Sequence, residues 1–108
     1  MESYTIHPIC AGRFASAEKS NFAYQKSAGE KLAAPILMYL VTGKNTCMLV
    51  DTGCCDEAWA AAYHHPLTQT EDMKPVNALK KLGVEAGDVT VIVNTHLHWD
   101  HCFNNHLF

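Results

Sequence analysis

Residues 89–93, VTVIV, form a short apolar run of mostly β-branched side chains that leads directly into a cluster of histidines. Runs of this length and composition are typical of a strand buried in a sheet. His96, His98, Asp100 and His101 follow almost at once. Burying so many polar groups without partners would cost about 1–3 kcal/mol for each group. The sequence therefore predicts a shared ligand, and a metal ion is the ligand that imidazole and carboxylate groups favour.

The spacing within the cluster predicts two neighbouring metal ions. Side chains two residues apart on an extended or tightly turned segment point to the same side, so His96 and His98 are predicted to bind one ion together. Asp100 and His101 face the other way around and are predicted to bind a second ion close by. Zinc is the expected metal, with iron and manganese as alternatives.

Two further apolar runs, residues 35–41 and 46–50, flank the segment TGKN. Gly43 and Asn45 supply turn chemistry, so the two runs are predicted to form a β-hairpin. Nearly every position in both runs is apolar, which predicts strands covered on both faces.

Two segments between the hairpin and the last strand have helical patterns. Residues 74–84 are the clearer one, with a proline in the first turn, apolar residues at three-residue spacing and Gly83 at the end. Residues 56–63 are predicted to form a short helix with Asp56 as N-cap and with Trp59 and Tyr63 in the core.

The first third of the chain carries weaker signals. Residues 4–7 alternate as in a strand, Pro8 favours an edge position, and His7 is expected at the surface. Residues 11–31 have no sustained apolar period and are interpreted as a long loop with at most a helical turn. The order of strands, helix and strand indicates an α/β or α+β fold.

HLHWDH, residues 96–101, resembles the HxHxDH motif of the metallo-β-lactamase fold, and VDTG, residues 50–53, resembles the first motif of that family. From about residue 35 onward, the order of hairpin, VDTG, helix and histidine motif is also similar to the order in that family. LVDTG and THLHWDHCFNN most resemble the N-acyl homoserine lactonase-like branch. The resemblance implies the first half of an αββα sandwich, incomplete as given, with residues 1–108 as the amino-terminal part of a single domain.

The resemblance also implies roles for individual residues. His96 and His98 would hold one metal ion, and Asp100 and His101 the second, with two zinc ions per complete site. Asp51 would orient a ligand histidine. Hydroxide activated by the ions would open a lactone or another ester, and Asp100 would be the catalytic residue that passes a proton to the leaving alkoxide. Substrate-binding residues are not assigned.

For the other candidate residues, ordinary structural roles are expected. Trp99 is expected to pack beneath the cluster, Asn104 and Asn105 to act as turn or cap residues, and Cys102 to be a small buried side chain. His106 is expected not to bind metal, and His64 and His65 to rim a cleft or face solvent. The odd number of cysteines, five without a CxxC pair, favours reduced thiols, with a redox or metal role for Cys54 and Cys55 as the alternative.

Composition and charge indicate which classes of binding partner to expect. The formal charge of −3 is mild and the eight basic residues are scattered, which argues against nucleic-acid binding. The longest apolar run is too short to span a bilayer, and the first residues lack the plan of a secretory signal, so a cytoplasmic location without membrane contact is expected. A small ester or lactone is the expected substrate, and a homo-oligomer is left open.

Two ligands per ion fall short of the three that a catalytic zinc takes from its protein. The strands are also predicted to be covered on both faces, but only one convincing helical pattern is available to cover them. Both observations predict a fragment that is inactive alone and needs a missing carboxy-terminal half or a complementary chain. Alternatives are a thioesterase or phosphodiesterase of the same fold, or a non-catalytic metal-binding or assembly module.

Overall fold

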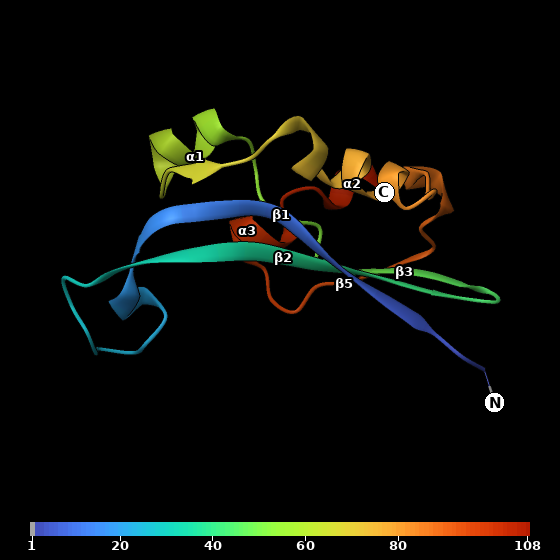
Figure 1. The fold of residues 1–108 in the computed structure, drawn as a ribbon, viewed down its shortest axis with the longest axis horizontal. Coiled ribbons are helices and arrows are strands. Elements are labelled where there is room, and N and C mark those ends of the chain that lie inside the picture. Colours follow the sequence, from blue (N-terminus) through green and yellow to red (C-terminus); the bar gives the residue numbers. More distant parts are fainter. Residues whose placement is uncertain (1) are drawn as a thin grey trace.

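A computed structural model describes residues 2–108 as one five-stranded sheet with helices gathered on one face (Figure 1). The strand order is β4-β1-β2-β3-β5. The strands are β1 (Thr5–Glu18), β2 (Lys31–Gly43), β3 (Thr46–Val50), β4 (Leu67–Thr68) and β5 (Val91–Val93). The helices are α1 (Glu57–Tyr63), α2 (Pro75–Lys81) and α3 (Trp99–Cys102). Single 3-10 turns occur at Lys19–Asn21, Glu71–Met73, Ala86–Asp88 and Asn105–Leu107. This mixed architecture confirms the predicted fold class.

The interpretation of residues 11–31 as a long loop was wrong for its first part, because β1 continues to Glu18 and pairs with β2. Small side chains explain the missed signal. Ala11 and Ala17 are fully buried and Phe14 is nearly so, but alanines give the strand little apolar contrast in the sequence. The predicted helical turn is present at Lys19–Asn21.

The predicted hairpin is confirmed, since β2 and β3 pair in antiparallel register from Tyr39–Val50 to Gly43–Thr46. β5 then adds in parallel beside β3, with Leu49 opposite Ile92. The chain between these two parallel strands contains α1 and α2, and this crossover places both helices on the same face of the sheet (Figure 1).

The helix side of the sheet carries the core. Met38, Leu40, Leu49 and Leu79 are fully buried there. The N-cap prediction is confirmed, because the Asp56 carboxylate accepts a 2.8 Å hydrogen bond from the backbone N–H of Trp59.

The prediction that Tyr63 lies in the core was wrong, because Tyr63 is 70% exposed. In α2 the buried residues are Pro75, Ala78 and Leu79, whereas Leu82, the C-cap that follows the helix, is 43% exposed. A seven-residue helix lying on a sheet buries a narrow stripe of side chains, and in α1 the buried residue is Ala60.

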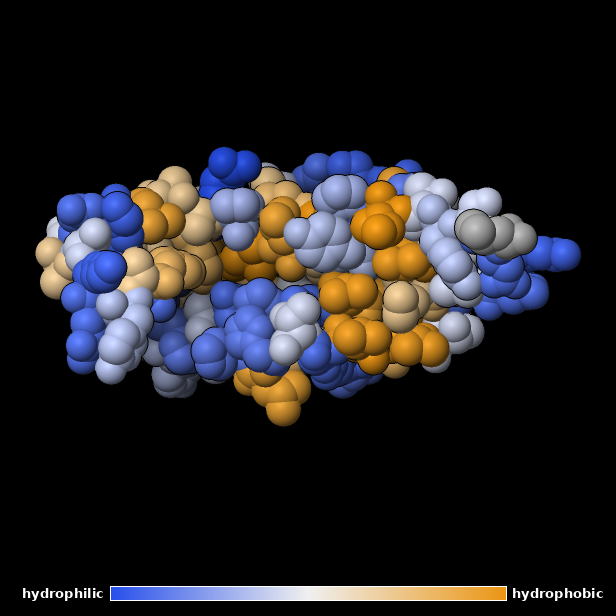
Figure 2. Space-filling view, turned by 90° about the horizontal axis from the view of Figure 1, so that it is seen from below, coloured by the Kyte–Doolittle hydropathy of each residue, from blue (hydrophilic) through white to orange (hydrophobic). Residues whose placement is uncertain are grey.

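The opposite face of the sheet is open among the described residues, although the strand sequences predict covering on both faces. Register aligns apolar side chains in rows across four strands there: Ile6, Val41, Met48 and Val91 in one, and Pro8, Tyr39, Val50 and Val93 in the next. Figure 2 views this face from below and shows the apolar side chains gathered on it. The described residues therefore expose an apolar sheet face, with Ile6, Val91 and Val93 each more than 40% exposed.

No helix among residues 2–108 combines the length and the apolar character that crossing a bilayer requires.

Candidate metal centre

The histidine motif lies where β5 ends and the chain turns into α3. Residues 94–98 form a loop on the side of the sheet away from α1 and α2 (Figure 1). His96 and His98 are exposed on this loop, whereas Asp100 and His101 are half-buried at the start of α3. His98 is the N-cap of that helix, and its carbonyl accepts hydrogen bonds from the N–H groups of His101 and Cys102.

The loop brings the three imidazoles of the motif together. The ring centroids of His96 and His98 are 4.5 Å apart, and those of His96 and His101 are 4.0 Å apart. An Asp100 carboxylate oxygen, Oδ2, lies 3.5 Å from His101 Nε2. All four predicted ligands therefore belong to one cluster, with the Asp100–His101 pair beside the His96–His98 pair.

Asp51 reaches this cluster from a distant part of the sequence. It follows β3, is 3% exposed and adopts a positive φ of 60°, which is rare for a residue other than glycine. One carboxylate oxygen lies 2.7 Å from His101 Nδ1, and the other accepts a 2.8 Å hydrogen bond from the backbone N–H of Thr95. The Thr95 hydroxyl lies within hydrogen-bond distance of both oxygens.

These contacts set the charge and the tautomer at the site. Burial acts to raise the pKa of Asp51, but the hydrogen bonds from His101 and Thr95 outweigh burial and hold that pKa below its ordinary value. An ionised carboxylate can only accept, so His101 Nδ1 carries the proton and donates it. In the neutral ring His101 Nε2 is then the nitrogen with the free lone pair, and it lies on the side of Asp100.

The donor set fits zinc in its chemistry, because it combines neutral imidazole nitrogens with a carboxylate and a second carboxylate that fixes one imidazole. It does not complete a site. Within residues 2–108, no group of three or more His, Cys, Asp or Glu side chains converges in an arrangement able to hold one ion. The described residues therefore supply pairs of donors rather than a full coordination sphere.

The other candidate residues near the histidine cluster differ in their burial. Trp99 packs among aromatic side chains, with its ring stacked on His64 at a centroid distance of 4.8 Å and edge-on to Phe14 at 5.8 Å. His64 is exposed, as expected, and His106 is exposed as well. Cys102 is half-buried rather than buried, because the short α3 turns it only partly inward.

Cys54 and Cys55 are buried free thiols. Burial raises the pKa of Cys54 to about 12 and that of Cys55 to about 11. Thiols that remain protonated at neutral pH are poor nucleophiles and poor metal ligands, so the structural interpretation of this pair is favoured over a redox or metal role.

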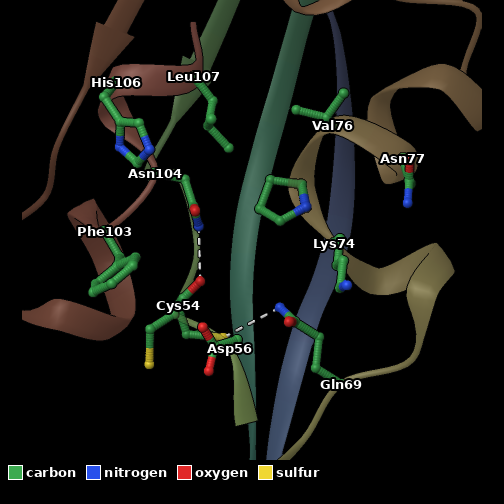
Figure 3. Close-up of a pocket in the computed structure, with 12 residues that line it drawn as sticks. Cys54, Asp56, Gln69, Lys74, Val76, Asn77, Phe103, Asn104, His106 and Leu107 are labelled. Atoms are coloured by element: carbon green, nitrogen blue, oxygen red, sulfur yellow. Dashed lines mark hydrogen bonds between the residues drawn. The ribbon is translucent and has the colours of Figure 1, made fainter. Parts of the chain in front are cut away.

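The expectation that Asn104 and Asn105 are turn or cap residues is confirmed by their positions, but sequence reasoning missed their long-range hydrogen bonds. Asn104 is the N-cap of Asn105–Leu107 but makes no side-chain capping bond there. Its amide instead donates to the carbonyls of Thr52 and Cys54 (Figure 3). The partners lie about fifty residues away, so no local spacing could have indicated them.

Asn104 also borders a cavity of about 330 Å³ on the helix side of the sheet (Figure 3). Its lining residues come from the segment after β3, from α2 and the residues before it, and from the end of the chain. None of the four predicted metal ligands is among them, so this cavity is separate from the histidine cluster.

The sequence profile of the Metallo-beta-lactamase superfamily matches residues 33–108. The chain belongs to this superfamily. An N-acyl homoserine lactonase from a Bacillus species is 33% identical over 89 residues, covering 74% of this chain and 36% of that relative.

Solved structures of the superfamily also superpose on the chain. Bacillus thuringiensis AiiA with N-decanoyl-L-homoserine bound at its active site gives a TM-score of 0.81 at 30% identity, covering 95% of this chain and 44% of AiiA. AidC, described as a dizinc quorum-quenching lactonase, gives 0.60 at 22% identity, a likeness of fold alone, with 94% and 37% covered. The chain spans less than half the length of each of these relatives. They support the lactonase-like branch of the superfamily.

Proposed function

We propose that the protein carrying this chain is a metal-dependent hydrolase that opens the ring of an N-acyl homoserine lactone. The observation that carries the proposal is the hydrogen bond between Asp51 and His101 beside His96, His98 and Asp100. It joins the two family motifs, VDTG and HxHxDH, into one cluster in a chain whose relatives include N-acyl homoserine lactonases.

His96 and His98 would hold one zinc ion, and Asp100 with His101 Nε2 the other. When bound, such ions acidify water and polarise a carbonyl group. Asp51 keeps the His101 ring oriented and its Nδ1 protonated, so that Nε2 is presented to the metal. Asp100, 3.5 Å from that nitrogen, would take a proton from the attacking water and pass it to the oxygen that leaves when the lactone ring opens.

The ligands and the cleft that complete this site would come from a further layer of the protein packed on the open sheet face. Two observations support this part of the proposal. The motif loop lies on that face (Figure 1), and apolar side chains gather on part of the same face (Figure 2). A complementary chain is the alternative source of that layer, and residues 2–108 alone are expected to be inactive because their donor set is incomplete.

The test uses the protein with its full natural sequence, loaded with zinc. We expect hydrolysis of N-hexanoyl and N-decanoyl homoserine lactones, loss of activity after chelation and recovery on adding zinc back. A thioester and a phosphodiester serve as comparison substrates. Zinc-loaded protein that hydrolyses either of these but leaves the lactones intact would overturn the lactonase assignment, and protein that binds zinc without any hydrolysis would favour a non-catalytic module.

Asp100→Asn supplies the matched variant. We expect kcat to fall by about 10²-fold or more, because the variant loses both a ligand and the proton carrier. Asp88→Asn, in the turn before β5, makes the same change outside the cluster and should leave kcat unchanged.

A further inference from the structure

Three asparagines near the histidine motif share a hydrogen-bond network with one threonine of the VDTG segment. The members are Asn94, Asn104, Asn105 and Thr52, and we call them the asparagine clamp. Thr52 is fully buried, and the three asparagines are half-buried. Within residues 2–108, no buried side-chain nitrogen or oxygen lacks a hydrogen-bond partner, so the network is satisfied.

Asn104 joins the end of the chain to the segment after β3. Its Nδ2 donates to the Cys54 carbonyl at 2.7 Å and to the Thr52 carbonyl at 3.0 Å, and its backbone N–H donates to Thr52 Oγ1 at 3.2 Å (Figure 3). Three bonds from one residue hold this segment in place. Because two of them are made by the side-chain amide, only a residue with an NH₂ group at this distance can make both.

Asn105 joins the same segment to the end of β5. Its Oδ1 accepts from Thr52 Oγ1 at 2.9 Å and from Asn94 Nδ2 at 3.2 Å, while its Nδ2 donates to Asn94 Oδ1 at 2.8 Å. The two amides therefore form a reciprocal pair of hydrogen bonds. Three parts of the chain, after β3, after β5 and after α3, are locked together by these side chains.

The clamp surrounds the Asp51–His101 hydrogen bond. Thr52, directly after Asp51, donates its backbone N–H to the His101 carbonyl at 2.8 Å. Asn94 Nδ2 lies 3.5 Å from the same carbonyl. The backbones at both ends of the Asp51–His101 bond are thus fixed by clamp contacts, including the positive φ of Asp51, which a free chain would avoid.

We propose that the asparagine clamp is a positioning device that holds His101 Nε2 in its ligand orientation before any metal ion arrives. The inference rests on the proposed metal site. The members of the asparagine clamp are positioning residues and not ligands, since they act on the metal only through Asp51 and His101. A preorganised ligand loses less conformational freedom on binding, so loss of the clamp should weaken metal binding more than it weakens the fold.

Asn104→Asp is the sharpest variant, because it keeps the shape of the side chain but replaces both amide donors with an oxygen facing two carbonyls. Asn45→Asp, in the exposed turn of the hairpin, is the matched control for the change in charge. Asn104→Gln restores the NH₂ group, and the adjoining cavity offers room for the added methylene. Asn105→Asp is a milder variant, which loses only the donor to Asn94 and serves if Asn104→Asp fails to fold.

The measurements are made on the full natural protein. Zinc affinity is obtained by competition with a chromogenic chelator, the fold is followed by Tm, and the His101 ring nitrogens are observed by NMR in the metal-free protein. We expect Asn104→Asp to lose about 10- to 100-fold in zinc affinity and to lose the uniform Nδ1–H signature of His101. Asn104→Gln should recover most of both, and Asn45→Asp should match the natural protein.

The proposal is overturned if Asn104→Asp and Asn105→Asp fold, bind zinc within about twofold of the natural protein and keep the His101 signature. It is also overturned if affinity falls only in proportion to the fraction unfolded, or if the natural protein binds no zinc. These readouts do not depend on substrate, so a zinc-binding protein that opens no lactone would remove the lactonase proposal and leave the clamp standing.

Discussion

Asp51 Oδ2 and His101 Nδ1 lie 2.7 Å apart, although fifty residues separate them in the sequence. The bond connects the turn after β3 with α3, and it leaves His101 Nε2 facing Asp100. A buried carboxylate that fixes a ligand imidazole also raises the basicity of that ligand. The relationship is therefore the most direct physical link between the fold and the proposed metal chemistry.

Replacing Asp51 by Asn should lower zinc affinity by about 10- to 100-fold. The amide has one oxygen where the carboxylate has two, so it cannot accept fully from both His101 and Thr95. Competition titration with a chelator measures the change. Asp56→Asn is the control, because asparagine is also a good N-cap and Asp56 lies at α1. Equal zinc affinity in Asp51→Asn and the natural protein would contradict the role assigned to Asp51.

Glu18 predicts a pH dependence of stability. The side-chain hydrogen bond from Lys31, with further bonds from the Gly29 N–H and Ser20, lowers the pKa of Glu18 from 4.5 to about 2. The folded state thus favours ionised Glu18, so the stabilisation is complete above pH 4.5 and is lost as the pH falls toward 2. Chemical denaturation at several pH values should show Glu18→Gln losing its stability difference from the natural protein across this window. A difference that stays constant with pH would refute the assignment.

Leu79→Ala should destabilise the fold by about 2–5 kcal/mol, because Leu79 is fully buried between α2 and the sheet. Leu82→Ala removes the same atoms three residues later from a side chain that is 43% exposed, and it should cost less than about 1 kcal/mol. The free energy of unfolding of both variants, obtained from urea titration, tests the difference. Comparable losses would mean that α2 lies differently on the sheet.

Gly53→Ala should destabilise the turn that carries Asp51. Gly53 has a φ of 76°, and an added Cβ would come within 2.8 Å of Ala11 Cβ and 3.2 Å of Pro75 Cγ. The left-handed conformation alone costs a residue with a Cβ about 1–2 kcal/mol, and the close contacts add to it. Gly87→Ala is the control, since open space surrounds that glycine. A Tm for Gly53→Ala equal to that of Gly87→Ala would show that the turn can relax.

Where a pattern depends on neighbouring residues, the sequence predicted the structure. The N-cap at Asp56, the helix that begins at Pro75, and the hairpin around Gly43 all depend on side chains within a few positions of the backbone that they organise. The four proposed ligands, His96 to His101, are close for the same reason, because six consecutive residues cannot separate far. Asp51 was reached only through the resemblance of VDTG to a family motif.

Tertiary structure decided everything that depends on residues distant in the chain. Only pairing with β2 made residues 11–18 a strand, since Ala11 and Ala17 carry no signal of their own. Only packing chose which side of α1 is buried, which left Tyr63 70% exposed. The asparagine clamp likewise exists only because three segments meet, and an amide has no preference for a distant carbonyl until the fold has placed it within hydrogen-bond distance.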